Sequence, residues 1–214
     1  MKKFMFFLVA AFICSTASAQ LVTSTTITKK RTKAVWYLKA GMNIANISGD
    51  GVDASSIAGY NVGIMFDRPF GNSGAFWGMG LQLATKGFKI EDEISGVEAS
   101  TKYFANKLEI PLNFGYKFQI NDDLAVDARV GGFANYDVFG KVKYTVKSQG
   151  DEETESISLG DAVDAGDRFG AGIQFGVGVW YQHLNFNITY QKGLVDQFDG
   201  AKENNWMLSL GYAF

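Results

Sequence analysis

The sequence has very few of the residues that build disulfides, metal sites and rigid kinks. Its 214 residues include one cysteine, one histidine and two prolines. Cys14 lies in the N-terminal stretch that we expect to be removed, and Ile13 before it does not fit a lipoprotein cleavage site. The mature chain is then free of cysteine, which excludes a disulfide framework and a thiol nucleophile. A single histidine leaves no second His or Cys ligand for zinc.

Long apolar runs are also missing. The apolar run at residues 4–13 follows Lys2 and Lys3 and precedes Ala17-Ser18-Ala19, which is the order of a signal peptide. The run is too short to cross a bilayer as a helix. We therefore predict a signal peptide over residues 1–19 that directs secretion across the inner membrane. The polar stretch 20–35 is predicted to be a flexible periplasmic N-terminal segment.

No excess of one charge marks the chain. It has 20 basic and 22 acidic residues, and removal of Lys2 and Lys3 leaves a net charge of about −4. Nucleic-acid binding needs a concentrated basic face, so we expect no nucleic-acid partner. The 25 glycines are typical of a twisted, tightly curved sheet. The length indicates one folded domain.

The dominant pattern in the chain is alternation with a period of two. Within residues 107–118 every second side chain is apolar, from Leu108 through Leu112 to Phe118. Such alternation indicates a strand with one apolar face. The pattern recurs in eight segments: 36–46, 57–67, 75–88, 107–118, 124–136, 168–181, 184–192 and 204–214.

The connections between these segments are alternately long and short. The long ones are 47–56, 89–102, 138–167 and 193–203, and the short ones are 68–74, 119–123 and 182–183. Transmembrane barrels have this asymmetry, with short turns in the periplasm and long loops outside. The predicted fold is all-β: an eight-stranded antiparallel up-and-down transmembrane β-barrel over residues 36–214, with both termini periplasmic.

Alternation alone also fits a soluble barrel whose apolar face lines a ligand cavity. Three features favour the membrane. The second face consists largely of Gly, Asn, Ser, Thr and Gln, and the strands of ten to twelve residues can cross the hydrocarbon core. Aromatic residues gather at the strand ends, as membrane interfaces select. The predicted aromatic girdle comprises Trp36, Trp77, Tyr116, Phe118, Tyr181, Trp206, Tyr212 and Phe214.

The chain resembles a family of small outer-membrane β-barrels of Gram-negative bacteria, labelled PorT-like or outer membrane protein beta-barrel domain. The resemblance covers about residues 36–214. It rests on residues 38–46 (LKAGMNIAN), 83–87 (LATKG), 108–112 (LEIPL), 193–194 (GL) and 210–214 (LGYAF). It implies an outer-membrane location. The final aromatic residue also resembles the signal that the barrel assembly machinery reads, which makes that machinery an expected partner of the C-terminal strand.

Charged residues on the non-apolar face are predicted to lie in the lumen: Lys39, Lys86, Lys107, Glu109, Lys117, Asp127 and Arg129. Glu109 lies near the level of Lys86, and Asp127 near that of Arg129. A buried charge without a partner costs several kcal/mol, so these groups should pair across the lumen. They could form a selective pore or a polar plug. Eight strands leave room only for side chains, which favours the plug.

Three other features have structural interpretations. Pro111 lies within a strand and should produce a bulge or irregular register. His183 lies in a short periplasmic turn, where no serine nucleophile can be placed beside it, which argues against an enzyme. The acidic segment 151–155, with Asp161, Asp164 and Asp167, could bind a divalent cation or a partner. It does not match the Ca²⁺ loop pattern, which favours a solvated loop.

The sequence thus predicts a monomeric outer-membrane barrel without cofactor or catalytic site. Outer-membrane lipid is an expected partner, and an extracellular ligand at the long loops is a further one. The favoured role is structural or surface interaction, with a closed, polar-plugged lumen. The alternative is a barrel associated with transport or protein export, which requires an open lumen or a periplasmic partner for the N-terminal segment.

Overall fold

The computed structural model describes residues 33–214 except 50–53, 72, 95–96, 149–150 and 199. The chain divides into two units, residues 1–30 and 31–214. The predicted signal peptide lies outside the described residues. The predicted N-terminal segment 20–35 does so too, except for its last three residues, and Val35 already begins the first strand.

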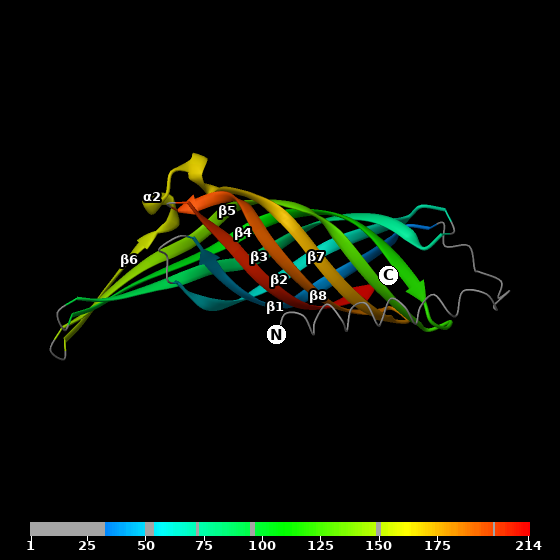
Figure 1. Cartoon of the computed structure of the whole chain (residues 1–214), viewed down its shortest axis with the longest axis horizontal. Coiled ribbons are helices and arrows are strands. Elements are labelled where there is room, and N and C mark those ends of the chain that lie inside the picture. Colours follow the sequence, from blue (N-terminus) through cyan, green and yellow to red (C-terminus); the bar gives the residue numbers. More distant parts are fainter. Residues whose placement is uncertain (1–32, 50–53, 72, 95–96, 149–150, 199) are drawn as a thin grey trace, which may run out of the picture. The chain divides into compact units, whose positions relative to one another are not determined.

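Eight antiparallel strands close into a ring (Figure 1). Pairing runs from each strand to the next through β1, β2, β3, β4, β5, β7, β8 and β9, and β9 pairs back to β1. This confirms the predicted eight-stranded antiparallel up-and-down barrel. The strands of the ring are β1 (Val35–Ser48), β2 (Ala54–Pro69), β3 (Ala75–Ile94), β4 (Val97–Gln119), β5 (Leu124–Ser148), β7 (Phe169–Tyr181), β8 (Leu184–Phe198) and β9 (Ala201–Ala213).

Alternating residues of each strand face opposite sides of the ring, because successive side chains of a strand point in opposite directions. In β1, Leu38 and Met42 are exposed on the outside, whereas Tyr37 and Asn43 are buried inside. The outside is therefore a continuous apolar surface and the inside is mainly polar. This is the inverse of a soluble globular core.

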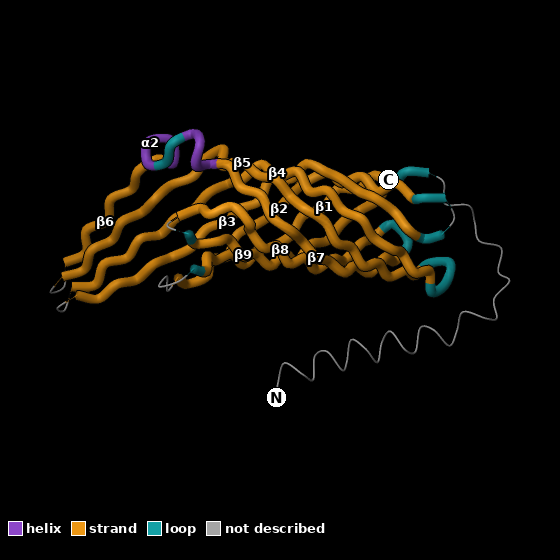
Figure 2. The backbone as a smooth tube through the Cα atoms, turned by 45° about the horizontal axis from the view of Figure 1, so that its top comes forward, coloured by secondary structure: helices purple, strands orange, loops and turns teal. Residues whose placement is uncertain are grey.

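The strands extend much further than the sequence predicts (Figure 2). The predicted loop 89–102 is largely a hairpin of β3 and β4, and the predicted loop 138–167 contains the end of β5 and a ninth strand, β6 (Asp151–Ser158). β6 pairs with β5 alone, outside the ring. We call the β3–β4 hairpin within 89–102, the end of β5 from 138 and β6 the strand extension. In Figure 1 it lies at the end away from the C-terminus. The prediction of loops rested on the polar composition of these segments. A sheet that is solvated on both faces can also be polar throughout, so composition alone could not distinguish the two.

The third predicted loop, 193–203, is also mostly strand. β8 continues to Phe198 and β9 begins at Ala201, and Gly200 has a positive φ of 77° that suits a tight turn. The two-residue turn at 182–183 lies where it was predicted. There the backbone N–H of Gln182 donates a hydrogen bond of 2.7 Å to the backbone carbonyl of Asp123, which connects the two neighbouring turns.

The expectation of a bulge at Pro111 is wrong. The β3–β4 register is the same before and after Pro111, although pairing is interrupted between the pairs Met79–Leu112 and Gln82–Glu109. Proline removes one ladder hydrogen bond without adding a residue, so the strand keeps its phase. The irregularity lies instead where Asn106 pairs with Phe139 and Lys107 pairs with Asp137, which leaves one extra residue in β5.

Two short helical turns follow β6: α2 (Leu159–Ala162) and the 3₁₀ turn η2 (Ala165–Arg168). The Arg168 guanidinium holds them together by donating to the carbonyls of Gly160 and Val163 at distances of 2.7–3.0 Å. Among the described residues, no helix is long and apolar enough to cross a membrane.

Candidate functional site in the lumen

Two clusters of buried charge occupy the inside of the ring. The loop-side network consists of Lys86, Lys107, Glu109, Asp137 and Glu203, near the end where the strand extension begins. The turn-side network consists of Tyr37, Asp67, Lys117, Asp127, Arg129 and Trp180, near the short turns. The clusters form because the inward positions of several strands carry charged side chains at matching levels.

The loop-side network is a chain of ion pairs that joins four strands. Lys86 Nζ lies 2.7 Å from Glu109 Oε2 and 2.9 Å from Glu203 Oε1. Lys107 Nζ lies 2.7 Å from Glu203 Oε2 and 3.1 Å from Asp137 Oδ1. Glu203 therefore bridges both lysines. With both lysines and all three carboxylates ionised, this network has a formal charge of −1.

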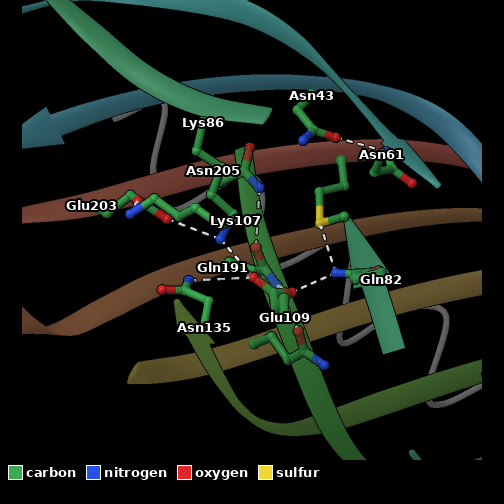
Figure 3. Close-up of polar contacts among 12 residues, drawn as sticks. Asn43, Asn61, Gln82, Lys86, Lys107, Glu109, Asn135, Gln191, Glu203 and Asn205 are labelled. Atoms are coloured by element: carbon green, nitrogen blue, oxygen red, sulfur yellow. Dashed lines mark hydrogen bonds and ion pairs between the residues drawn. The ribbon is translucent and has the colours of Figure 1, made fainter. Parts of the chain in front are cut away.

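Amide side chains supply further hydrogen bonds to Glu109 (Figure 3). Gln82 and Gln191 both donate to Oε1 of Glu109, and Asn135 donates to Oε2 at 3.5 Å. The amide of Asn205 in turn donates to Gln191 at 3.0 Å. A buried carboxylate is stable when a cation and several donors surround it, and Glu109 has both.

The turn-side network is organised around a single guanidinium. Arg129 binds Asp127 through two parallel hydrogen bonds of 2.9 and 2.8 Å, a bidentate geometry that lysine cannot form. It also donates to the Tyr37 hydroxyl at 2.9 Å, and Asp67 lies 3.7 Å away.

Aromatic rings complete this network. The Trp180 indole N–H donates to Asp127, and Lys117 Nζ lies 3.6 Å from the centre of the Trp180 ring. Phe76 contributes a second ring face, 5.3 Å from the centre of the Arg129 guanidinium. A cation held over a ring is attracted to the negative charge of its face, most strongly where water is excluded.

Glycines make room for the turn-side carboxylates. A Cβ at Gly78 would lie 2.2 Å from Asp67 Oδ1, and one at Gly178 would lie 2.9 Å from Asp127 Oδ2. Neither approach is compatible with a larger side chain unless the carboxylate moves. These two positions thus use glycine for close contact.

Apolar side chains cover the networks at the two ends. At the turn side, Tyr37, Met65, Trp180 and Ala213 pack together. At the loop side, Leu159 of α2 is 1% exposed and packs with Phe88, Tyr103 and Val142, and we call this group the apolar cap. Between the networks, a cavity lined by Lys39, Asn113 and Gln174 has a volume of about 10 Å³, enough for about one water molecule.

The structure places all seven predicted lumen charges on the inward phase of the ring. Glu109 pairs with Lys86 and Asp127 pairs with Arg129, whereas Lys117 contacts the Trp180 ring. Sequence reasoning missed Asp67, Asp137 and Glu203 as members of the networks. Glu203 was placed in a loop, although it continues the inward phase of Asn205 and Met207, and that alternation could have revealed it.

The eight predicted girdle residues all lie on the outward phase of their strands. Trp36 and Trp77 both contact Phe66, with ring centres 4.8 and 5.5 Å apart, and Tyr116 contacts Phe118 at 4.5 Å. Trp206 contacts Tyr190 at 4.8 Å, near the loop-side end. The remaining members, Tyr181, Tyr212 and Phe214, are 56–70% exposed on the turn side.

The other candidate sites do not join the lumen networks. The ring of His183 lies in its turn with its centre 6.1 Å from that of Tyr212. The acidic segment 151–155 was expected to be a loop and belongs to β6 instead. Within the described part of the chain, no group of three or more His, Cys, Asp or Glu side chains could hold a metal ion.

Comparison with known families gives a match over most of the chain. Residues 19–199 match the model of a family described as outer membrane protein beta-barrel domain. No curated protein matches the sequence.

The solved structures with a similar arrangement include several bacterial proteins. The chain is similar to Ail, the attachment invasion locus protein of Yersinia pestis, solved with the heparin analogue sucrose octasulfate, at 18% identity, with 85% of this chain and 99% of Ail covered and a TM-score of 0.41. It is similar to Neisserial surface protein A at 13% identity, 85% and 99% coverage and a TM-score of 0.44. For the N-terminal barrel of Pseudomonas aeruginosa OprF, the identity is 10%, with 87% of this chain and 100% of the OprF barrel covered and a TM-score of 0.32.

Proposed function

The chain belongs to the outer membrane protein beta-barrel domain family, and from that premise we propose that it is a closed, non-conducting barrel. Its role is structural or surface interaction, exerted through the strand extension outside the membrane. It acts as a monomer, without cofactor or catalysis. Membrane lipid surrounds its apolar outside, and the barrel assembly machinery recognises its C-terminal strand.

The apolar cap is the observation that carries the closed lumen. An ion that left the loop-side network through the apolar cap would pass Leu159, Phe88 and Val142, whose side chains are 1–5% exposed and offer no hydrogen bonds. Removing hydration water from an ion at such a constriction is costly. Beneath the cap, the paired charges of the two networks fill the remaining space.

The strand extension supports a role in surface interaction. One face of it carries exposed apolar side chains, with Tyr144 40% and Val146 46% exposed. Both belong to β5 beyond the ring, in the part that pairs with β6. Apolar side chains held on a rigid, solvated sheet favour binding of another macromolecule, because sheet structure fixes them without further ordering.

Planar-bilayer conductance of the refolded full chain tests the closed lumen. Heat-modifiable gel migration shows that the barrel has formed before it is added. We expect folded protein without stable conductance steps. Steady, ion-selective steps from folded wild-type protein would overturn the closed lumen and favour the transport or export alternative.

A matched pair of variants locates the barrier. Phe88→Ala combined with Leu159→Ala removes two side chains of the apolar cap, whereas Leu38→Ala combined with Leu208→Ala removes similar volume from the outer surface. If the cap limits ion entry, flickering conductance should appear only in the first variant. Conductance of the second variant alone would show that the cap is not the barrier.

A further inference from the structure

Four lysines lie together on the outer face of the strand extension. Lys89 of β3 pairs with Lys102 of β4, which pairs with Lys143 of β5, and Lys141 precedes Lys143 by two residues. Residues directly opposite each other on neighbouring strands point to the same face, as do residues two apart in one strand. We call Lys89, Lys102, Lys141 and Lys143 the lysine row.

The lysine row continues the apolar outside of the barrel. Register between β3 and β4 is unshifted from the pair Gln82–Glu109 to the pair Lys89–Lys102. Lys89 therefore shares the face of Leu81, and Lys102 shares that of Leu108, and both leucines are exposed on the outside. Phe88 and Tyr103, on the alternate phase, are buried in the apolar cap.

In β5 the extra residue near Val138 brings the lysines to this face. Asn135 and Asp137 point inward, so uninterrupted alternation would send Lys141 and Lys143 inward as well. The register shift leaves both Val138 and Phe139 exposed and turns Val142 inward. A one-residue insertion exchanges the two faces of a strand beyond it.

The lysine row lies at the height expected of lipid headgroups. Lys143 follows the exposed Phe139 by four residues, which is about 13 Å along a strand. The tilt of barrel strands reduces this to roughly 10 Å along the membrane normal. Headgroups occupy roughly 5–8 Å beyond the hydrocarbon core on each side. Long lysine side chains can also reach back toward that layer.

The positive charge of the row is not balanced by its neighbours. Like charges directly opposite each other on adjacent strands are destabilising. Lys89 has Glu91 at 2.5 Å, but Lys102, Lys141 and Lys143 have no carboxylate within 4.0 Å among the described side chains. The β6 residues opposite Lys141 and Lys143 are Ser158 and Ser156, both exposed hydroxyl donors.

We propose that the lysine row binds the phosphate groups of a phosphorylated glycolipid in the outer leaflet. Ammonium and hydroxyl donors on four adjacent strands suit an anion with several oxygens. The row is continuous with the lipid-contacting surface, so acyl chains of the same molecule can lie on the apolar strands below. That continuity favours a lipid over free phosphate. The inference is independent of whether the lumen conducts.

Titration with lipid A, a bisphosphorylated glycolipid, tests the proposal. The refolded full chain is held in zwitterionic detergent, and bound lipid is counted by native mass spectrometry. Each basic residue near an anionic lipid surface contributes about 1 kcal/mol. Loss of two lysines in Lys102→Glu combined with Lys143→Glu should therefore weaken binding about 30-fold, and Lys102→Arg combined with Lys143→Arg should preserve it.

Lys192→Glu combined with Lys202→Glu is the matched control. It makes the same charge change at outward positions of β8 and β9, on another side of the ring. All variants must show heat-modifiable migration. The proposal is overturned if the control loses as much affinity, if dephosphorylated lipid A binds wild type equally well, or if millimolar inorganic phosphate displaces the lipid completely.

Discussion

The two lumen networks solve the same problem, burial of paired charge, with different cations. The loop-side network uses two lysines as point charges, and each contacts two carboxylates. The turn-side network uses one arginine, whose planar fork holds Asp127 in a fixed geometry among aromatic rings. The first network is partly redundant, because Glu203 contacts both lysines, whereas in the second Asp127 receives both of its guanidinium hydrogen bonds from Arg129. We therefore expect the two networks to lose different amounts of folding free energy when their cations are removed one at a time.

Arg129→Met should produce the largest loss. It leaves the buried Asp127 without its bidentate partner and removes the guanidinium that lies 3.7 Å from Asp67. Breaking a buried pair by removing one partner costs roughly 3–5 kcal/mol. We expect a loss of that size in the free energy of unfolding, measured by denaturant titration of the barrel in phospholipid vesicles.

A second substitution distinguishes lost pairing from lost packing. Arg129→Met combined with Asp127→Asn removes the stranded charge and should recover part of the stability, because contacting residues are energetically coupled. If the double variant is as unstable as the sum of the two single variants, the pair is not the source of the loss.

Lys86→Met should have a smaller effect, about 2 kcal/mol. Glu203 keeps Lys107 at 2.7 Å, and Glu109 keeps its amide donors. The same denaturant titration gives the comparison. A loss equal to or above that of Arg129→Met would show that the loop-side network is not redundant.

Gly78→Ala should have the smallest effect, about 1–2 kcal/mol, by crowding Asp67 away from Arg129. Gly166→Ala is the control, because a Cβ at Gly166 would have nothing within 4 Å. The midpoint of denaturant unfolding should fall for the first substitution and stay unchanged for the second. Equal midpoints would show that Asp67 moves without cost.

Strand phase was readable from the sequence where one face contacts a uniform apolar surrounding. Leu108, Leu112 and Phe118 alternate with polar residues, and the structure confirms the eight-stranded ring to which this strand belongs. Beyond the ring, both faces of the sheet contact water, so apolar and polar residues no longer alternate with the two faces of the strand. This is why Ser156 and its neighbours were predicted as loop although they pair with β5.

The lumen partners were less predictable than the lumen itself. Which side chains meet across a barrel depends on the stagger between strands, and that stagger is fixed by contacts of the whole ring. Glu203 joins Lys86 and Lys107 although it lies about a hundred residues away in sequence. The extra residue in β5, which turns Lys141 outward, has no local signature because Val138 and Phe139 both suit a strand.

β6 gives the molecule an open edge. Among the described strands only β5 pairs with it, so one row of its backbone donors and acceptors is available to another strand. Such edges promote association unless charge opposes it. Glu153 and Glu155 are exposed there. Two copies meeting edge to edge would place acidic strands side by side, so this edge should keep neighbouring barrels apart in a crowded membrane while still accepting a basic strand.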